Sequence, residues 1–283
     1  MKLSVVLAVR NEEANLARCL ESIKHIASEI VIVDEYSTDN TISIAKKYGA
    51  RVYKEPHHAI FHITKQKALS YAKSEWILQL DADEVVTPSL GREIIDVING
   101  KSVKIDLKKE ALFRRHQRVV EMRDGRIGKR TGEVVAYFIP RVNMFLGKPL
   151  IHAGVYPDAV IRLIKNGKAH FPAKSVHEQI EIEGEVGWLN SDLEHYDSPT
   201  LTRYIDRANR YTSLTAKEFE QKNVGKNLLG IFYYSVIKPS IVFLKLYFRH
   251  RGYLDGMRGF LWSYFSAIHY SIAYFKYYSG GYE

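Results

Sequence analysis

The feature that most constrains the fold of this chain is the alternation of short apolar runs with helical patterns through its first hundred residues. Residues 3–8 form a continuous apolar run, which is typical of a strand buried on both faces. Further strands are expected at residues 30–34, 51–53 and 76–80. Strand–helix alternation with short connections predicts an α/β fold in which helices cover both faces of a mostly parallel sheet.

The helices expected between these strands are placed by their capping residues. Asn11 is expected to cap the first helix, in which Leu16, Cys19, Leu20 and Ile23 have helical spacing and make Cys19 a core residue. The others are expected to start at Asp39, to span residues 65–73, and to run from Thr87-Pro88 to Gly100. Capping is the expected main role of Asp39.

Polar clusters follow three of the expected strands, at residues 10–12, 34–37 and 81–83. Ligands of parallel sheets bind at the carboxyl ends of the strands, so a binding site is expected at this edge. Asp81 and Asp83 lie on one side of an extended segment, and hard oxygen ligands of this kind suit Mg²⁺ or Mn²⁺. Most acid-x-acid triplets are solvated loops, but this one directly follows an apolar strand.

The segments SVVLAVRNEEANLARCLESI, IVIVDEYSTDNT and KQKALSYAKSEWILQLDADE together resemble glycosyltransferase family 2. The resemblance implies the GT-A nucleotide-sugar-binding fold and an acid-x-acid motif that holds a divalent cation, Mg²⁺ or Mn²⁺, on the donor diphosphate. By resemblance, Asp83 is the metal ligand, while Asp81 reaches the ribose or assists the metal. The sugar-nucleotide pocket would be formed by Val9, Asn11, Glu12, Asp34, Lys65, Asp81 and Arg162.

The second half resembles a branch of that family that includes lipopolysaccharide-core glucosyltransferases. The shared patterns are a Tyr-Pro-Asp…Arg-Leu stretch at 156–163, Val-His-Glu at 176–178, a His-Tyr-Asp segment at 195–197, and Lys-Pro and Gly-x-x-Asp-Gly in the tail. The sequence departs from the family where the commoner Asp-Asp-Gly-Ser is replaced by residues 34–37, Asp-Glu-Tyr-Ser.

Sugar transfer needs a carboxylate that deprotonates the acceptor hydroxyl. The resemblance suggests Glu178 as this general base, with Asp197 in reserve. His177 would orient Glu178 or contact the diphosphate or the metal, although a lone His-Glu pair is usually a surface pair. Arg162 would hold a phosphate, with a structural salt bridge as the alternative. His57, His58 and His62 are expected to line a loop or the acceptor cleft.

Charge and aromatic residues are concentrated late in the chain. Residues 101–130 hold eleven Lys/Arg and four acids, +7 of the whole-chain +9, and seventeen of the 34 aromatic residues lie in 231–283. We expect a GT-A domain at 1–225 with a basic insertion at 101–130, and a helical region at 226–283 that associates with an anionic membrane or forms a homo-oligomer. The insertion is expected to be solvated and mobile; contact with an anionic leaflet is the second alternative and nucleic acid the third, because no nucleic-acid motif accompanies it.

Three functions compete on these grounds. The first is an inverting, metal-dependent glycosyltransferase that moves a sugar from a nucleoside-diphosphate sugar, expected to be a UDP-sugar, to a lipopolysaccharide-core-type glycolipid. The N-terminus lacks a signal-peptide core, so this enzyme would be cytoplasmic and peripheral to the inner face of the plasma membrane. The second transfers to polyprenyl phosphate, capsule or a protein glycan. The third is a non-catalytic basic adaptor for membrane or nucleic acid.

Overall fold

The structure is a computed structural model that describes residues 2–129, 131–172 and 180–281. The chain divides into two compact units. The first comprises Met1–Arg141 and Pro157–His195, and the second comprises Val142–Tyr156 and Tyr196–Glu283. The first unit holds the expected α/β fold.

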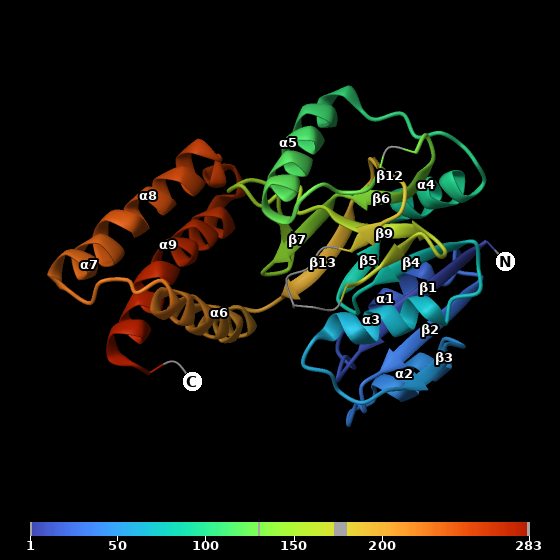
Figure 1. Cartoon of the computed structure of the whole chain (residues 1–283), viewed down its shortest axis with the longest axis horizontal. Helices are drawn as coiled ribbons and strands as arrows, with labels where there is room; N and C mark the ends of the chain where they lie inside the picture. Colours follow the sequence, from blue (N-terminus) through green and yellow to red (C-terminus); the bar gives the residue numbers. More distant parts are fainter. Residues whose placement is uncertain (1, 130, 173–179, 282–283) are drawn as a thin grey trace. The chain divides into compact units, whose positions relative to one another are not determined.

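The first unit is built around a seven-stranded sheet with the order β12-β6-β9-β4-β1-β2-β3 (Figure 1). Its strands are β1 (Leu3–Val9), β2 (Glu29–Asp34), β3 (Arg51–Lys54), β4 (Trp76–Leu80), β6 (Val134–Ile139), β9 (Val160–Lys165) and β12 (Glu185–Trp188). The β1, β2, β3 and β4 strands are parallel, as are β6 and β12, while β9 runs antiparallel to both β4 and β6. The predicted α/β class with a mostly parallel sheet is therefore confirmed.

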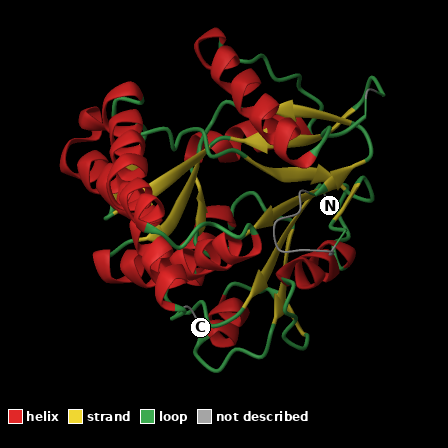
Figure 2. Cartoon of the chain, turned by 60° about the vertical axis from the view of Figure 1, so that its left-hand side comes forward, coloured by secondary structure: helices red, strands yellow, loops and turns green. Residues whose placement is uncertain are grey.

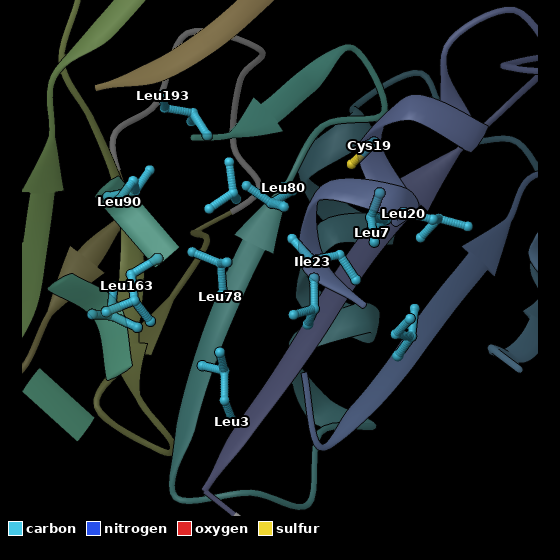
Figure 3. Packing of buried hydrophobic residues seen from close by; sticks show 14 of the residues in the cluster. Leu3, Leu7, Cys19, Leu20, Ile23, Leu78, Leu80, Leu90, Leu163 and Leu193 are labelled. Carbon is cyan, nitrogen blue, oxygen red and sulfur yellow. The ribbon is translucent and has the colours of Figure 1, made fainter. Parts of the chain in front are cut away.

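Helices cover both faces of this sheet, because successive side chains of a strand point to opposite sides. They are α1 (Leu16–Ile23), α2 (Thr41–Lys47), α3 (Phe61–Ser70), α4 (Pro88–Ile98) and α5 (Leu107–Asp124). The buried hydrophobic residues of this unit form two clusters, and the neighbouring residues Val5 and Val6 of β1 belong to the first and the second of them. Figure 3 shows the first cluster, where Cys19 of α1 lies among leucine and isoleucine side chains. The prediction that Cys19 is a core residue is confirmed, and burial raises the pKa of its thiol.

Two predicted helix starts were wrong. Asn11 has a left-handed backbone with φ of 54°, and α1 begins five residues later at Leu16. The Asn11 side chain instead accepts the N–H of Thr38 at 2.8 Å, so it joins the loops after β1 and β2. The α3 helix begins at Phe61, before the expected residue 65. Asp39 does support its helix, since its carboxylate accepts the N–H of Thr41, the first residue of α2, at 3.0 Å.

The basic segment 101–130, which was expected to be a solvated insertion, contains the eighteen-residue helix α5. Phe113 and Val120 of this helix are buried. The Phe113 ring stacks on Trp188 of β12 with a centroid distance of 4.3 Å, and Trp188 also stacks on Phe138 of β6. Phe113 is therefore the buried aromatic anchor of α5 on the sheet, and Lys109 adds a polar contact by donating to the Asn190 carbonyl at 2.7 Å.

The second unit consists mainly of helices (Figure 2). It contains the antiparallel pair β7 (Arg141–Phe145) and β8 (Lys148–Leu150), and helices α6 (Leu201–Gln221), α7 (Leu228–Phe232), α8 (Lys238–Leu244) and α9 (Gly256–Ser279). A π-helical turn, Tyr233–Ile237, joins α7 to α8, and a second one, Lys245–Arg249, extends α8, so that one helix runs over Leu228–Arg249. The helical C-terminal region is thus confirmed. Since α6 packs on α9 through Ala216 and Phe219, this unit begins well before the expected boundary at residue 225.

Candidate functional site

The acidic motif at the end of β4 is built around Asp81. The Lys65 ammonium of α3 lies 2.6 Å from Asp81 Oδ1, and the Arg162 guanidinium of β9 donates to Oδ2. Burial by itself would raise the pKa of Asp81, but the charges of Arg162 and Lys65 outweigh it and hold the pKa far below the usual range. Asp81 is therefore ionised at any physiological pH, and a cation contacts each of its oxygens.

Glu84, the first residue of β5 (Glu84–Val86), is a second buried carboxylate in this network. Its fully buried carboxylate accepts the Asp81 N–H at 2.9 Å, Arg162 Nη2 at 2.8 Å and Arg141 Nη1 at 3.3 Å. Arg141 also pairs with Asp158. Buried charges are stable only when paired in this way. Sequence reasoning missed Glu84 and Arg141, and the one available signal was a third acid directly after the motif.

Arg162 is the centre of this network. Burial opposes its charge, yet Asp81 and Glu84 raise the pKa of its guanidinium. It also donates to Gln79 of β4. Arg162 therefore forms structural salt bridges, which was the alternative interpretation of this residue. Its contact with a phosphate remains a proposal.

Asp83 lies beside a histidine from β13 (Leu193–Ser198). His195 Nε2 is 3.5 Å from Asp83 Oδ2, since residues 193–195 pair antiparallel with β5. Burial would raise the pKa of Asp83, but the hydrogen bond and charge of His195 lower it. His195 was missed as a site residue. Its signal was the His-Tyr-Asp segment, from which only Asp197 was selected.

A divalent cation fits the Asp83–His195 pair by its chemistry. Mg²⁺ is usually held by one or two carboxylates, with waters and substrate phosphates completing its coordination, and imidazole extends the donor set to Mn²⁺ and other transition metals. Within residues 2–129, 131–172 and 180–281, no group of three or more His, Cys, Asp or Glu side chains is arranged to hold a metal ion. The donor diphosphate would have to supply the remaining oxygen ligands.

The carboxyl end of β2 carries a buried carboxylate, Asp34, of which only one oxygen accepts a hydrogen bond. Asp34 is fully buried, and its Oδ2 accepts the N–H of Ser37 at 3.0 Å. Its Oδ1 has no hydrogen-bond partner among the residues that the structure describes. A buried acceptor without a donor is costly, so this atom is suited to a donor brought by a ligand.

Glu35, where the sequence departs from the family pattern, has a structural role. Its buried carboxylate accepts from Thr64 of α3 and lies 2.6 Å from His57 Nδ1. Glu35 lies 22 residues before His57 in the sequence and reaches it only in the folded chain. His62 stacks on Phe171 with a centroid distance of 4.9 Å.

The strand-end residues of the prediction come together at one edge of the sheet. Val9 and Asp34 are direct partners at the ends of β1 and β2, Asn11 and Glu12 follow Val9, and β4 pairs with β1 on its other side. His177 and Glu178 lie outside the described residues. Asp197 belongs to the second unit, where its carboxylate accepts from Arg207 of α6.

Comparison with known proteins gives the family of this chain. Residues 4–137 match the model of glycosyl transferase family 2. The chain is 30% identical to the lipopolysaccharide core biosynthesis glycosyltransferase LpsC of Rhizobium meliloti over 268 residues. The aligned region covers 92% of this chain and 86% of LpsC. An uncharacterized glycosyltransferase of Rickettsia prowazekii is 27% identical over 92% of this chain and 81% of its own length. The chain belongs to glycosyltransferase family 2, and the resemblance to its lipopolysaccharide-core branch is confirmed.

Among solved structures, one similar chain is glucosyl-3-phosphoglycerate synthase from Mycobacterium tuberculosis in complex with Mn²⁺, UDP and phosphoglyceric acid. It is 20% identical, covers 43% of this chain and 49% of its own, and has a TM-score of 0.33. The likeness is too limited to bear on the function of this chain.

Proposed function

We propose that this glycosyltransferase moves a sugar, with inversion, from a UDP-sugar to a lipopolysaccharide-core-type glycolipid at the cytoplasmic face of the membrane. The observation that carries the proposal is the cluster at one sheet edge, where Asp83 and His195 lie beside the Asp81 network and Asp34 offers an unpaired acceptor. This cluster combines a cation site with a recognition site for a hydrogen-bond donor.

The donor would be recognised by side chains at the strand ends. Asp34 Oδ1 would accept an N–H of the nucleotide base, which in a UDP-sugar is the imide N–H of uracil. A Mg²⁺ or Mn²⁺ ion on Asp83 and His195 would neutralise charge on the leaving diphosphate. The contacts of Lys65 and Arg162 with Asp81 support a role for both cations in fixing the motif.

The acceptor hydroxyl must lose its proton as it attacks the anomeric carbon from the side opposite the diphosphate. The bond from carbon to the acceptor oxygen forms while the bond to the diphosphate oxygen breaks, and one such displacement inverts the carbon. Glu178 is the proposed base, on its resemblance to the family motif. Asp197 is the weaker candidate, since its carboxylate is already paired with the Arg207 guanidinium.

The acceptor proposal is supported by the similarity to LpsC. Transfer to polyprenyl phosphate, capsule or a protein glycan would use the same donor site and differ only in the acceptor. To distinguish these acceptors, purified protein is incubated with a radiolabelled donor and one acceptor class at a time. The acceptor that becomes radiolabelled is the substrate.

A thermal-shift panel tests the donor and the metal together. UDP-, GDP-, ADP- and CMP-sugars are each added with and without Mn²⁺, because a ligand at 100 times its Kd stabilises the fold by about 2.7 kcal/mol. We expect a Mn²⁺-dependent rise in Tm with UDP-sugars that Asp83→Ala abolishes. The matched control is Asp96→Ala, a half-exposed aspartate on α4. An unchanged shift in Asp83→Ala, or no shift with any nucleotide, would overturn the proposal.

A further inference from the structure

One helix of the second unit exposes a row of large apolar side chains. The helix over Leu228–Arg249 has 22 residues, and no part of its most apolar window is buried. Its exposed large side chains recur every three to five residues and include Leu229, Phe232, Val236, Ile241, Leu244 and Phe248. We call this set of exposed side chains the apolar stripe.

The opposite side of the same helix packs on α9 through aromatic side chains and two polar groups. The Tyr234 ring stacks on Tyr274, and the Phe243 ring contacts Phe260. The Lys238 ammonium lies 5.0 Å from the centre of the Tyr270 ring, and Ser271 donates to the carbonyl of Tyr234 at 3.0 Å. Gly230 permits this packing, since a Cβ at that position would collide with the Tyr274 hydroxyl. A helix on a water-facing surface has a polar outer face, whereas this helix is apolar on its outer side as well as on the side that packs on α9.

The charge around the stripe has one sign. Residues 226–258 contain six Lys/Arg, at 226, 238, 245, 249, 251 and 258, and one acid, Asp255. The Asp255 carboxylate is already occupied, because it accepts the N–H groups of Ile151 and His152 and contacts His152 Nδ1 at 2.8 Å. The stripe therefore has Lys226 before it, Arg249 and Arg251 after it, and no available anion.

We propose that the apolar stripe lies in the plane of an anionic phospholipid surface. Its side chains would enter the acyl boundary while the cations at both ends bind lipid phosphates, which is the arrangement of interfacial amphipathic helices. A second copy of the chain is a poorer occupant, because the stripe would bring cations against cations in either direction of pairing. The inference concerns this surface and goes beyond the proposed sugar transfer.

The packing behind the helix requires an in-plane position, although 22 residues are long enough to cross a bilayer. The α9 helix lies against α8 on one side and α6 on another. Lys276 of α9 donates to the Asn209 carbonyl of α6 at 2.6 Å, and α6 carries charged residues along its length. A crossing helix would have to draw Lys238 and these polar contacts into hydrocarbon or abandon α9, and both are costly.

Vesicle sedimentation tests the surface. Full-length protein is mixed with vesicles of phosphatidylglycerol and phosphatidylcholine, or of phosphatidylcholine alone. We expect at least tenfold tighter binding to the anionic vesicles, with partial release in 0.5 M salt because salt screens charge but not apolar contact. The double variant Val236→Glu/Ile241→Glu should weaken binding at least tenfold. Leu214→Glu, at a similarly exposed leucine on α6, should leave it unchanged.

Labelling tests the in-plane position. In a Cys19→Ala background, Lys226→Cys and Arg249→Cys place a single thiol before or at the end of the helix. A membrane-impermeant maleimide added outside the vesicles should label both, whereas protection of one would mean that the helix crosses and would overturn the proposal.

Other results would overturn it as well. Equal binding to both vesicle types, or full binding by Val236→Glu/Ile241→Glu, would refute the membrane surface. Light scattering that shows a dimer dissociated by this double variant, without vesicle binding, would make the stripe an interface between copies. The donor-induced Tm shift should be the same in the double variant and the wild type, so failure here leaves the sugar-transfer proposal standing.

Discussion

Replacing Arg162 with methionine would test whether the buried ion network holds the acidic motif in place. Arg162 donates to Asp81, Glu84 and Gln79, and its side chain is only 7% exposed. Methionine fills much of the same volume but cannot pair with a carboxylate. Glu84, fully buried, would keep only the Asp81 N–H and the more distant Arg141.

Removal of one partner from a buried ion pair typically destabilises a protein by about 3–5 kcal/mol, because it leaves an uncompensated charge. Domains of ordinary stability have about 5–15 kcal/mol in total. At roughly 2–4 °C of Tm for each kcal/mol in a domain of 150–250 residues, Arg162→Met should lower Tm by about 6–20 °C. The control is Arg123→Met on α5, whose pair with Asp124 is largely exposed on the arginine side and should change stability by no more than about 0.5 kcal/mol.

A second substitution identifies the cause of the loss. Glu84→Gln removes the buried charge while its amide oxygen can still accept the Asp81 N–H. If the orphaned carboxylate causes the instability, Arg162→Met/Glu84→Gln should recover at least half of the free energy of unfolding lost by Arg162→Met. The free energy of unfolding of the wild type, Arg162→Met and the double variant is measured by guanidinium unfolding followed by tryptophan fluorescence. A single variant within about 0.5 kcal/mol of the wild type, or a double variant less stable than the single, would refute the reasoning.

The pH dependence of the same variants follows from Asp81. Its folded-state pKa lies below its unfolded value of about 3.9, so its stabilisation is fully present above that value and is lost as pH falls through the folded pKa. Without Arg162 the folded pKa of Asp81 should rise, and its contribution to stability at pH 7 should shrink. The variant should therefore lose less additional stability than the wild type between pH 5 and pH 2.

Three further predictions concern the chemistry and the basic helix. Glu178→Gln should lower turnover by roughly 10²–10⁴-fold with the donor-induced Tm shift retained, and full activity together with a dead Asp197→Asn would move the base to Asp197. His195→Gln should remove the Mn²⁺-dependent part of the nucleotide Tm shift, and an unchanged Mn²⁺ titration would exclude His195 as a ligand. Phe113→Ala should cost about 3–5 kcal/mol and raise amide exchange across α5; slow exchange in that variant would show that its stacking on Trp188 does not anchor the helix.

The sequence alone determined the features that depend on near neighbours along the chain. The apolar run at 76–80 coincides with β4, and Thr87 caps α4 by accepting the N–H of Leu90, as its position before Pro88 predicts. The polar clusters after three strands indicated a site at one sheet edge, because parallel strands place their carboxyl ends together. Hydrophobic period and capping residues act within a few positions, so a linear pattern contains them.

Tertiary structure decided which distant side chains meet. Glu84 and Arg162 are 78 residues apart, and Asp83 meets His195 only because β13 returns beside β5. Asn11 appeared to be a helix cap but joins a loop 27 residues away, since its left-handed backbone turns the side chain there.

The same limit applies to the two late helices. The basic composition of 101–130 predicted a solvated segment, whereas the stacking of Phe113 on Trp188 depends on a residue 75 positions away. The tail has an aromatic composition that shows it must cover something, but its sequence could not show that Lys238 turns toward α9 and Phe248 away from it. Which face of a helix is buried depends on the free energy of packing against a partner, and that partner is defined only when the chain has folded.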